Sequence, residues 1–418
     1  MNFVRALAAL ASVSPLFAQY GGPAILARGQ APAAMAASQI DFRPYATVSG
    51  IYDSGLNGVS VDANGAPVND ASPGVSAGVG VSGLHSWKHT KIGLYYSGSF
   101  SHYSKSFYDG VTAQNLQLSI THQLSRHTVL SFNNNAALYG SNRTAPSLPQ
   151  TVEFDPTTTY VPTNDFFDNR TLSFSSQGSI AVQRSTRTSV SVGGDGFLVR
   201  RRSTALFGVT GAGAHGDIQY RTSRRATVGA MYSFMHYTFK GIYSGTDSHT
   251  AAATYSLALS RSTQLSGIGG ITRYENVFVQ TVAIDPAIAA LIGISSAQRV
   301  SYEAKIIPNL AFRLSKVVPS GTVFLFASHG LSPGNGLFLT STSTIAGAGY
   351  NYSGARHWAV STGASYNRSL SVGNVLGEYS SYAANLSVSR QVARATHLVA
   401  SFNARKYASG DFKNYNKW

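Results

Sequence analysis

Apolar residues alternate with small or polar residues in many separate stretches of the chain. Residues 116–121 read Leu-Gln-Leu-Ser-Ile-Thr, and residues 75–82 read Val-Ser-Ala-Gly-Val-Gly-Val-Ser. Successive side chains of a strand point to opposite faces, so a period of two predicts strands with one apolar and one polar face. The stretches mostly run for about 11 to 15 residues, longer than the five or six residues typical of globular sheets.

Short polar and basic turns separate many of these stretches. Residues 184–188 read Arg-Ser-Thr-Arg-Thr, residues 222–227 read Thr-Ser-Arg-Arg-Ala-Thr, and residues 260–263 read Ser-Arg-Ser-Thr, with a related segment at 314–316. Such turns between alternating stretches predict β-hairpins. Most of the intervening connections are longer and carry Gly, Asn, Asp or Pro, and the longest spans residues 141–168.

Long strands, one apolar face and two classes of connection together predict a closed barrel in a membrane. Lipid leaves no partner for unpaired backbone groups, so a spanning sheet must close on itself. We therefore expect an all-β fold, a single transmembrane antiparallel up-and-down β-barrel of about 16–18 strands, with short periplasmic turns and long extracellular loops. Seventeen strands are counted up to Tyr407. Segment 410–418 adds a short eighteenth strand, or one strand is miscounted, or the chain is truncated.

The N-terminus has the order of an export signal. A short charged segment, an apolar segment and a small residue at Ala18 predict a signal peptide at residues 1–18. Residues 19–41 are rich in Gly, Ala, Pro and Gln and predict a flexible periplasmic leader. The barrel is then expected over residues 42–418, with its last strand shortened or missing. No later apolar run approaches the length of about 20 residues that a membrane helix needs.

These features resemble those of porin-like outer-membrane β-barrel proteins of Gram-negative bacteria. The resemblance covers roughly residues 42–418 and rests on repeated alternation and on the two turn classes rather than on any single motif. It implies a location in the bacterial outer membrane. It also implies contacts with outer-membrane lipid and lipopolysaccharide, and assembly by the barrel-assembly machinery. The oligomeric state stays open.

Composition removes several function classes. Only 12% of residues are charged and cysteine is absent, so disulfides and cysteine-based metal or redox sites are excluded. The formal net charge is +15, but Lys and Arg are dispersed over the turns without a long basic run, and we expect no nucleic-acid partner.

The charges are sorted between the two classes of connection. Asp and Glu lie mainly in the long connections. The basic residues of the short turns predict a periplasmic rim formed by Lys88, Arg126, Arg187, Arg224, Arg225, Arg261, Arg356 and Arg390. This sorting fits an electrostatic axis along a pore. It also follows simply from strands leaving the lipid, because Arg or Lys at mid-membrane costs roughly 2–4 kcal/mol.

Two other groups of residues suggest contacts with the membrane. Arg200, Arg201 and Arg202 form a basic triplet on the outer side, suited either to lipopolysaccharide phosphates or to snorkelling at the interface. Aromatic residues near strand ends predict membrane girdles, made by Trp87, Tyr220, Tyr352, Trp358, Tyr139 and Tyr237. A lumen track for stacking sugars at Tyr95 and Tyr103 is the alternative use of inward aromatic rings.

Candidate chemistry is sparse, and we expect no enzyme, no cofactor and no metal site. Ser328 and His329 are adjacent, so on a strand they face opposite sides and cannot act as nucleophile and base. Asp155, Asp165 and Asp168 offer oxygen ligands, but loop Asp residues usually serve as turn residues.

The sequence therefore favours a passive porin-like channel for small polar solutes, with at most a weak anion preference. A structural or export barrel, used for surface anchoring or polysaccharide exit, is the first alternative. A barrel enzyme acting on lipid or peptide at the outer rim is the second.

Overall fold

A computed structural model of the chain describes residues 40–53, 60–61, 67–68, 72–104, 111–139, 171–202, 206–285, 291, 293–334, 336, 339–352, 354–355, 357–372, 378–393, 396–409 and 415–417. The expected signal peptide and most of the expected leader lie outside these residues. The first strand begins at Ile40, two residues before the expected start of the barrel.

The described residues form twenty strands. Their bounds are β1 (Ile40–Asp53), β2 (Ser60–Val61), β3 (Pro67–Val68), β4 (Ser72–Ser86), β5 (Thr90–Tyr103), β6 (Val111–Ser125), β7 (Thr128–Tyr139), β8 (Thr171–Gln183), β9 (Thr188–Arg201), β10 (Gly208–Arg221), β11 (Ala226–Lys240), β12 (Ser244–Ala258), β13 (Thr263–Ala283), β14 (Ser296–Val318), β15 (Gly321–Ser332), β16 (Thr340–Tyr352), β17 (Trp358–Val372), β18 (Glu378–Ala393), β19 (Thr396–Ser409) and β20 (Tyr415–Lys417). No helix among the described residues is long and apolar enough to cross a membrane.

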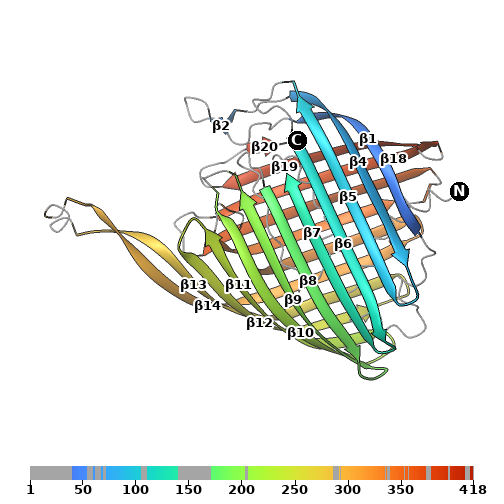
Figure 1. The fold of residues 1–418 in the computed structure, drawn as a ribbon, viewed down its shortest axis with the longest axis horizontal. Coiled ribbons are helices and arrows are strands. Elements are labelled where there is room, and N and C mark those ends of the chain that lie inside the picture. Colours follow the sequence, from blue (N-terminus) through green and yellow to red (C-terminus); the bar gives the residue numbers. More distant parts are fainter. Residues whose placement is uncertain are drawn as a thin grey trace.

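Eighteen strands form one sheet, and each pairs antiparallel with the next along the chain. The two others, β2 and β3, form a small separate hairpin in the connection between β1 and β4. Figure 1 shows the sheet curling round so that β14 to β19 cross behind β4 to β9. The expected antiparallel up-and-down barrel fold, with its 16–18 strands, is confirmed.

The two classes of connection lie at opposite ends of the sheet, as expected. Eight turns of two to five residues share one end, and the connections at the other end are mostly longer. One connection at that second end is short: residues 241–243 join β11 to β12, with Gly241 at a φ of 91°. The hairpin expected at 314–316 turns instead at Pro319 and Ser320. Lys316 is still part of β14 and pairs with Val323 of β15. Proline favours such a turn position because its φ is fixed.

The recurring serine explains the repeated turn sequence. The hydroxyl of Ser185 accepts hydrogen bonds from the backbone N–H groups of Arg187 and Thr188, at 3.1 and 3.0 Å. Ser223 does the same for Arg225 and Ala226, at 3.1 and 3.0 Å. A serine side chain that bonds to its own backbone two or three residues on stabilises a tight reversal without glycine. The exposed positions beside it can then carry arginine.

Strand register places the predicted faces as the alternation requires. Leu118 of β6 lies opposite Leu94 of β5 and Asn134 of β7, and Ser119 lies opposite Gly93 and Asn133. Leu116, on the same face as Leu118, is 42% exposed on the outside of the sheet. The apolar residues of these strands thus form the outer face, and the polar residues form the inner face.

The first and last of the seventeen long strands, β1 and β19, run in the same direction, because successive strands alternate in direction and seventeen is an odd number. Among the described residues no ladder joins β1 to β19. The short strand β20 descends beside β19 and pairs Tyr415 to Lys417 with Arg405 to Tyr407. Of the alternatives that the sequence left open for segment 410–418, this pairing agrees with a short eighteenth strand.

Strands β13 and β14 are the longest, with 21 and 23 residues. They pair along their whole length, but β14 pairs with β15 only from Leu310 to Val318. Pro308 lies just beyond that ladder, where a missing N–H is tolerated because the strand has become an edge. Beyond the end of β12, residues 279–283 of β13 and 296–300 of β14 therefore form a two-stranded arm, which projects to the left in Figure 1.

Candidate permeation pathway

The inner face of β6 and β7 is polar and open to solvent. Gln117, Ser119, Asn133 and Asn135 all point inward and are exposed. The Ser119 hydroxyl donates to Asn133 Oδ1 at 2.6 Å across the strand pair. We call these four residues the open wall. Such side chains exchange hydrogen bonds readily with water, so this side of the interior is wettable.

The inner face of β9 to β13 is packed instead. Phe197, Val199, Val209, Tyr237 and Phe239 form one buried cluster with Leu339, which precedes β16. A second cluster below it joins Met231, Ala252 and Ile268 of β11, β12 and β13. We call this inner face of β9 to β13 the packed wall.

Glycine gives the aromatic rings of the inner face room to lie flat. A Cβ atom added at Gly211 of β10 would lie 2.4 Å from the ring of Phe197 on β9. The same holds for Gly349 of β16, where the added atom would lie 2.3 Å from the ring of Phe324 on β15. A ring lying over a glycine of the next strand covers its exposed backbone and helps to fix the strand register.

Side chains from separate parts of the barrel meet across its interior. Thr246 of β12 and Thr340 of β16 share a hydrogen bond of 2.8 Å, although three strands lie between them in the sheet. Thr246 also donates to Asn276 of β13 at 3.0 Å. All three side chains are almost fully buried. At about 4.8 Å per strand, four steps along the wall would separate β12 from β16 by roughly 19 Å, so the outer end of β16 bends over the interior.

The two connections beside this contact complete a cross-lumen tether. The backbone N–H of Phe207, between β9 and β10, donates to the carbonyl of Gly336, between β15 and β16, at 3.0 Å. Arg201 Nη1 donates to the Phe207 carbonyl at 2.6 Å. We define the cross-lumen tether as the Thr246–Thr340 and Phe207–Gly336 hydrogen bonds. It holds the β15–β16 connection inside the outer mouth of the barrel and narrows the passage on that side.

Few charges face the interior, and several are closely packed. His215 Nδ1 lies 3.7 Å from Asp195 Oδ1, with both side chains mostly buried, and Ser191 donates a hydrogen bond to Asp217. Arg313 of β14 is buried and stacks over the ring of Phe324 at 5.2 Å. These groups line the packed side rather than the open wall.

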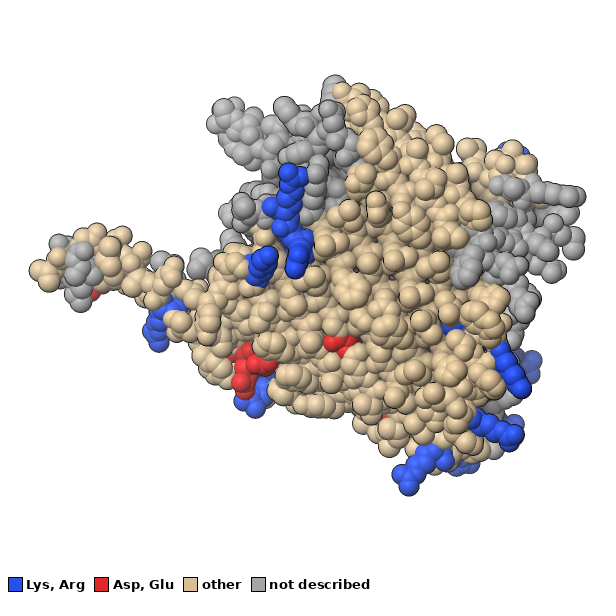
Figure 2. All heavy atoms as spheres, viewed as in Figure 1, with Lys and Arg blue, Asp and Glu red and all other residues tan. Residues whose placement is uncertain are grey.

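The basic rim residues lie together at the tight-turn end. Lys88, Arg126, Arg187, Arg224, Arg225, Arg261 and Arg390 are all exposed, whereas Arg356 lies outside the described residues. Figure 2 shows Lys and Arg at the lower right, where Figure 1 has the tight turns, and the Asp and Glu of this face lie farther left. The described tight turns contain no Asp or Glu. Among the described residues the tight-turn end therefore carries basic but no acidic turn residues, whereas the opposite end carries both signs, as at Arg200, Lys240 and Glu378.

The basic triplet divides between two faces, which corrects its assignment as one lipopolysaccharide contact. Arg200 pairs with Leu172 on the outer face and is exposed, and Arg202 is exposed beyond the end of β9. Arg201 points inward, where its guanidinium packs against Gly336 as part of the interior. Adjacent strand residues alternate in direction, so three consecutive arginines cannot contact one lipid surface.

Only some of the aromatic residues expected to form the girdle have rings on the outside of the barrel. Trp87, Tyr220 and Trp358 are exposed beside the tight turns, and Tyr352 is half-buried among them. Arg390 lies over the Trp358 ring at 5.1 Å, a cation–π contact at the rim. The side chain of Tyr139 is outside the described ones. Tyr237 was wrongly assigned: it is 2% exposed and belongs to the packed wall, because its position on β11 points inward.

The alternative sugar track is not supported by the position of Tyr103. That ring is buried against Ile51 of β1, whereas Tyr95 accepts a hydrogen bond from the Tyr45 hydroxyl at 3.4 Å. The two rings serve contacts between β1 and β5. Neither arrangement presents a row of free aromatic faces.

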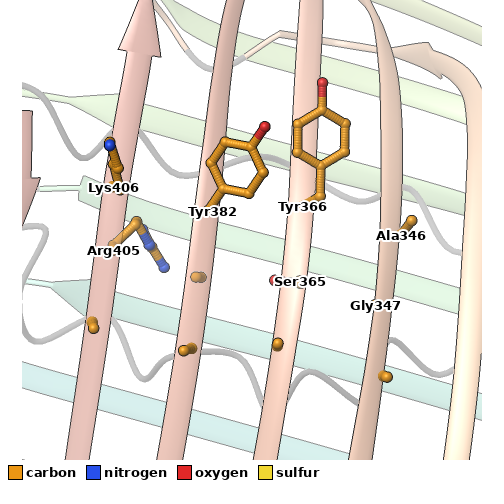
Figure 3. A pocket seen from close by; sticks show the side chains of 12 residues that line it. Ala346, Gly347, Ser365, Tyr366, Tyr382, Arg405 and Lys406 are labelled. Atoms are coloured by element: carbon orange, nitrogen blue, oxygen red, sulfur yellow. The ribbon is translucent and has the colours of Figure 1, made fainter. Parts of the chain in front are cut away.

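An apolar groove crosses the outer face of β16 to β19. Its volume is about 700 Å³, and its floor is made by small side chains in cross-strand register, namely Ala348, Ala364, Ala384 and Ala404. Tyr366 and Tyr382 stand along one side with ring centroids 5.1 Å apart, and Lys406 continues that row (Figure 3). The groove carries no arrangement of groups for chemistry and suits a wall that contacts lipid.

Catalytic and metal-binding arrangements do not emerge from the described residues. His329 points outward and bonds to Thr344 at 2.8 Å, and Ser328 points inward, as expected for adjacent strand residues. Within the described part of the chain, no three His, Asp or Glu side chains gather closely enough to hold a metal ion. Asp155, Asp165 and Asp168 lie outside the described residues.

The tether and the packed wall were missed at the sequence level. One signal was present: residues 337–339 read Leu-Phe-Leu, an apolar end to a connection that otherwise resembles the polar outer loops. A loop with three consecutive apolar residues needs a surface to cover them. Leu339, the described one of the three, is 5% exposed and packs on the packed wall.

Among known proteins, this chain is similar to several solved structures. No protein-family model matches the chain, and no curated protein sequence does either. The ferric-catecholate import receptor Fiu from E. coli K12 aligns at 11% identity and a TM-score of 0.42, over 90% of this chain and 66% of the receptor. The FrpB iron transporter from Neisseria meningitidis aligns at 9% identity and 0.44, over 89% and 63%. This chain thus spans slightly less than two thirds of both.

A BenF-like porin from Pseudomonas fluorescens Pf-5 aligns over nearly the whole of both chains. The alignment covers 90% of this chain and 96% of the porin, at 9% identity and a TM-score of 0.45. OpdQ from Pseudomonas aeruginosa gives similar values, with 9% identity, a TM-score of 0.44, and coverage of 90% and 95%. Porins are therefore among the solved structures to which this chain is similar.

Proposed function

We propose that the chain is a passive channel for small polar solutes in the outer membrane of a Gram-negative bacterium. The open wall carries this proposal. Exposed amide and hydroxyl groups line the inside of a barrel whose outer face is apolar. A barrel of this strand number encloses an aqueous lumen unless loops fill it. The tight turns would then face the periplasm and the arm the outside.

The cross-lumen tether would set the width of the passage. It fastens the β15–β16 connection to the packed wall and leaves the open wall uncovered. The neutral polar side chains of the open wall favour water and small polar solutes without selecting one of them. A weak anion preference is supported by the exposed basic rim, since rings of Arg and Lys favour anions in pores.

Single-channel conductance in planar bilayers tests the channel and the tether together. We expect steady conductance, and an increase or larger fluctuations in Thr340→Ala, which removes one hydrogen bond of the tether. A loss of about 1 kcal/mol shifts an opening equilibrium about fivefold. Thr342→Ala, a half-buried threonine two residues along the same strand and outside the tether, is the matched control and should conduct like the wild type.

The same bilayers test selectivity. Reversal potentials across a salt gradient should show a small anion preference that fades at high salt, because screening shortens the reach of the rim charges. A clear cation preference would contradict the role given to the rim. Absence of conductance in both the wild type and Thr340→Ala would favour the structural or export barrel instead.

A further inference from the structure

The arm and the segment of β14 at its base present a long strand edge that the described residues leave without a neighbouring strand. Residues 296–309 of β14 pair with β13 on one side, and the ladder to β15 begins only at Leu310. Most side chains along this segment are exposed, with Val300 at 60% and Tyr302 at 62%, and Ser301 and Glu303 are half-buried. The arm stands clear of the barrel body in Figures 1 and 2.

Such an edge favours pairing with another strand. Its outward N–H and C=O groups form a ready template, and natural proteins usually block exposed edges with proline, short strands or charges. Here Pro308 lies at the base of the arm, so it blocks the edge near the barrel and leaves residues 296–307 clear. A two-stranded ribbon alone is only marginally stable in water, and a third strand would stabilise it.

The edge sequence is complementary to itself. We propose that β14 pairs antiparallel with β14 of a second copy of this chain, with Ser301 of each copy directly opposite the other. Arg299 then lies opposite Glu303 of the second copy, and Glu303 lies opposite its Arg299. Val300 and Tyr302 face each other in the same reciprocal way on the other face. Two charge pairs and two apolar cross-strand pairs result, of the kind that stabilises antiparallel sheets.

Neighbouring registers lack this complementarity. Centring the pair on Tyr302 puts Arg299 opposite Lys305, and centring it on Glu303 puts two carboxylates together. Centring it on Val300 leaves Arg299 opposite Ser301. Registers whose two-fold axis passes between two residues are excluded, because directly opposite residues would then have side chains on different faces of the sheet.

The charges along this edge of β14 are available for this pairing. Glu303 forms an ion pair with Lys305 of its own strand, and its side chain keeps acceptor positions for a second cation. Arg299 is exposed and has no ion pair among the described residues. In the two-fold symmetric dimer, Arg299 of each copy gains an ion pair with Glu303 of the other copy, so the same contact occurs twice.

Charge exchange on the full-length protein, purified in detergent, tests the pairing. The wild type should form dimers by sedimentation, and Arg299→Glu or Glu303→Arg should each lower the association constant about tenfold, since each sets like charges opposite in two places. The double variant should restore the wild-type value. An equimolar mixture of the two single variants should also dimerise, because their edges are complementary.

Disulfide formation tests the register, since the chain has no cysteine of its own. Oxidised Ser301→Cys should form covalent dimers, because opposite strand residues lie about 5 Å apart. Gln298→Cys is the control: its two copies would lie about 20 Å apart, far beyond disulfide reach. Equal cross-linking at both positions, or a wild type that stays monomeric, would overturn the proposal, and the monomer would point to a strand from another protein.

Discussion

The open wall and the packed wall share one sequence pattern and differ in their surroundings. Ser119 of β6 and Thr250 of β12 are both hydroxyl residues at inward positions of alternating strands. Ser119 is exposed, whereas Thr250 is 8% exposed and bonds to Thr272 at 2.8 Å. A polar inward face therefore does not by itself mean a wet one. The side chains that pack against the inner face decide between the two.

The largest expected effect sets these two positions against each other. Thr250→Arg places a charge in a packed interior without a partner, which costs about 3–5 kcal/mol, whereas Ser119→Arg extends into water and should be tolerated. Urea unfolding of the purified barrels measures the difference. If both variants assemble with equal stability, the packed wall is wet in the membrane and the comparison fails.

The next effect compares the two faces of one strand. Leu118→Arg points a charge into lipid and should cost roughly 2–4 kcal/mol, while its neighbour Ser119→Arg serves as the control. The folded fraction recovered from membranes reports the cost. Equal sensitivity at the two positions would indicate that both faces of β6 are packed, as in a soluble sandwich.

The smallest effect should be the same beside either wall. Ser125→Ala, beside the open wall, and Ser260→Ala, beside the packed wall, each remove a hydroxyl that accepts a backbone N–H in a tight turn. Each should destabilise the barrel by about 0.5–1.5 kcal/mol. Ser125 lies at the turn from β6 to β7 and Ser260 at the turn from β12 to β13, and neither turn depends on the interior. A much larger loss at one turn would show that this turn also supports the wall above it.

Local rules were enough to predict the fold. The alternation at Leu118 and Ser119 gives the faces, and Ser185 and Ser223 give the turns, because both depend only on residues close in sequence. Alternation also turns Arg201 and Tyr237 inward, but both were assigned to the lipid surface from their positions near strand ends. Their burial depends on where the β15–β16 connection folds, and that is decided by residues more than a hundred positions away.

The length of β14 also exceeded its expected range. Alternation continues through residues 296–309, so periodicity gives no sign that β15 has ended its ladder at His329. Pro308 was the local signal for an edge, since proline is confined to strand edges and bulges. Its meaning becomes clear only once the neighbouring strand is known.

The strictly sequential pairing of the sheet has a consequence for the order of folding. Every ladder from β1 to β20 joins strands adjacent along the chain, so each closes a loop that is short by comparison with the whole. Contact order is thus low everywhere except where the two ends of the sheet must meet. Closing a loop of roughly 370 residues rather than a hairpin of about 15 costs about 3 kcal/mol more in chain entropy, at about 0.6 kcal/mol per doubling. Hairpins can therefore accumulate one after another, and the meeting of the first and last strands is the slow, entropically costly step.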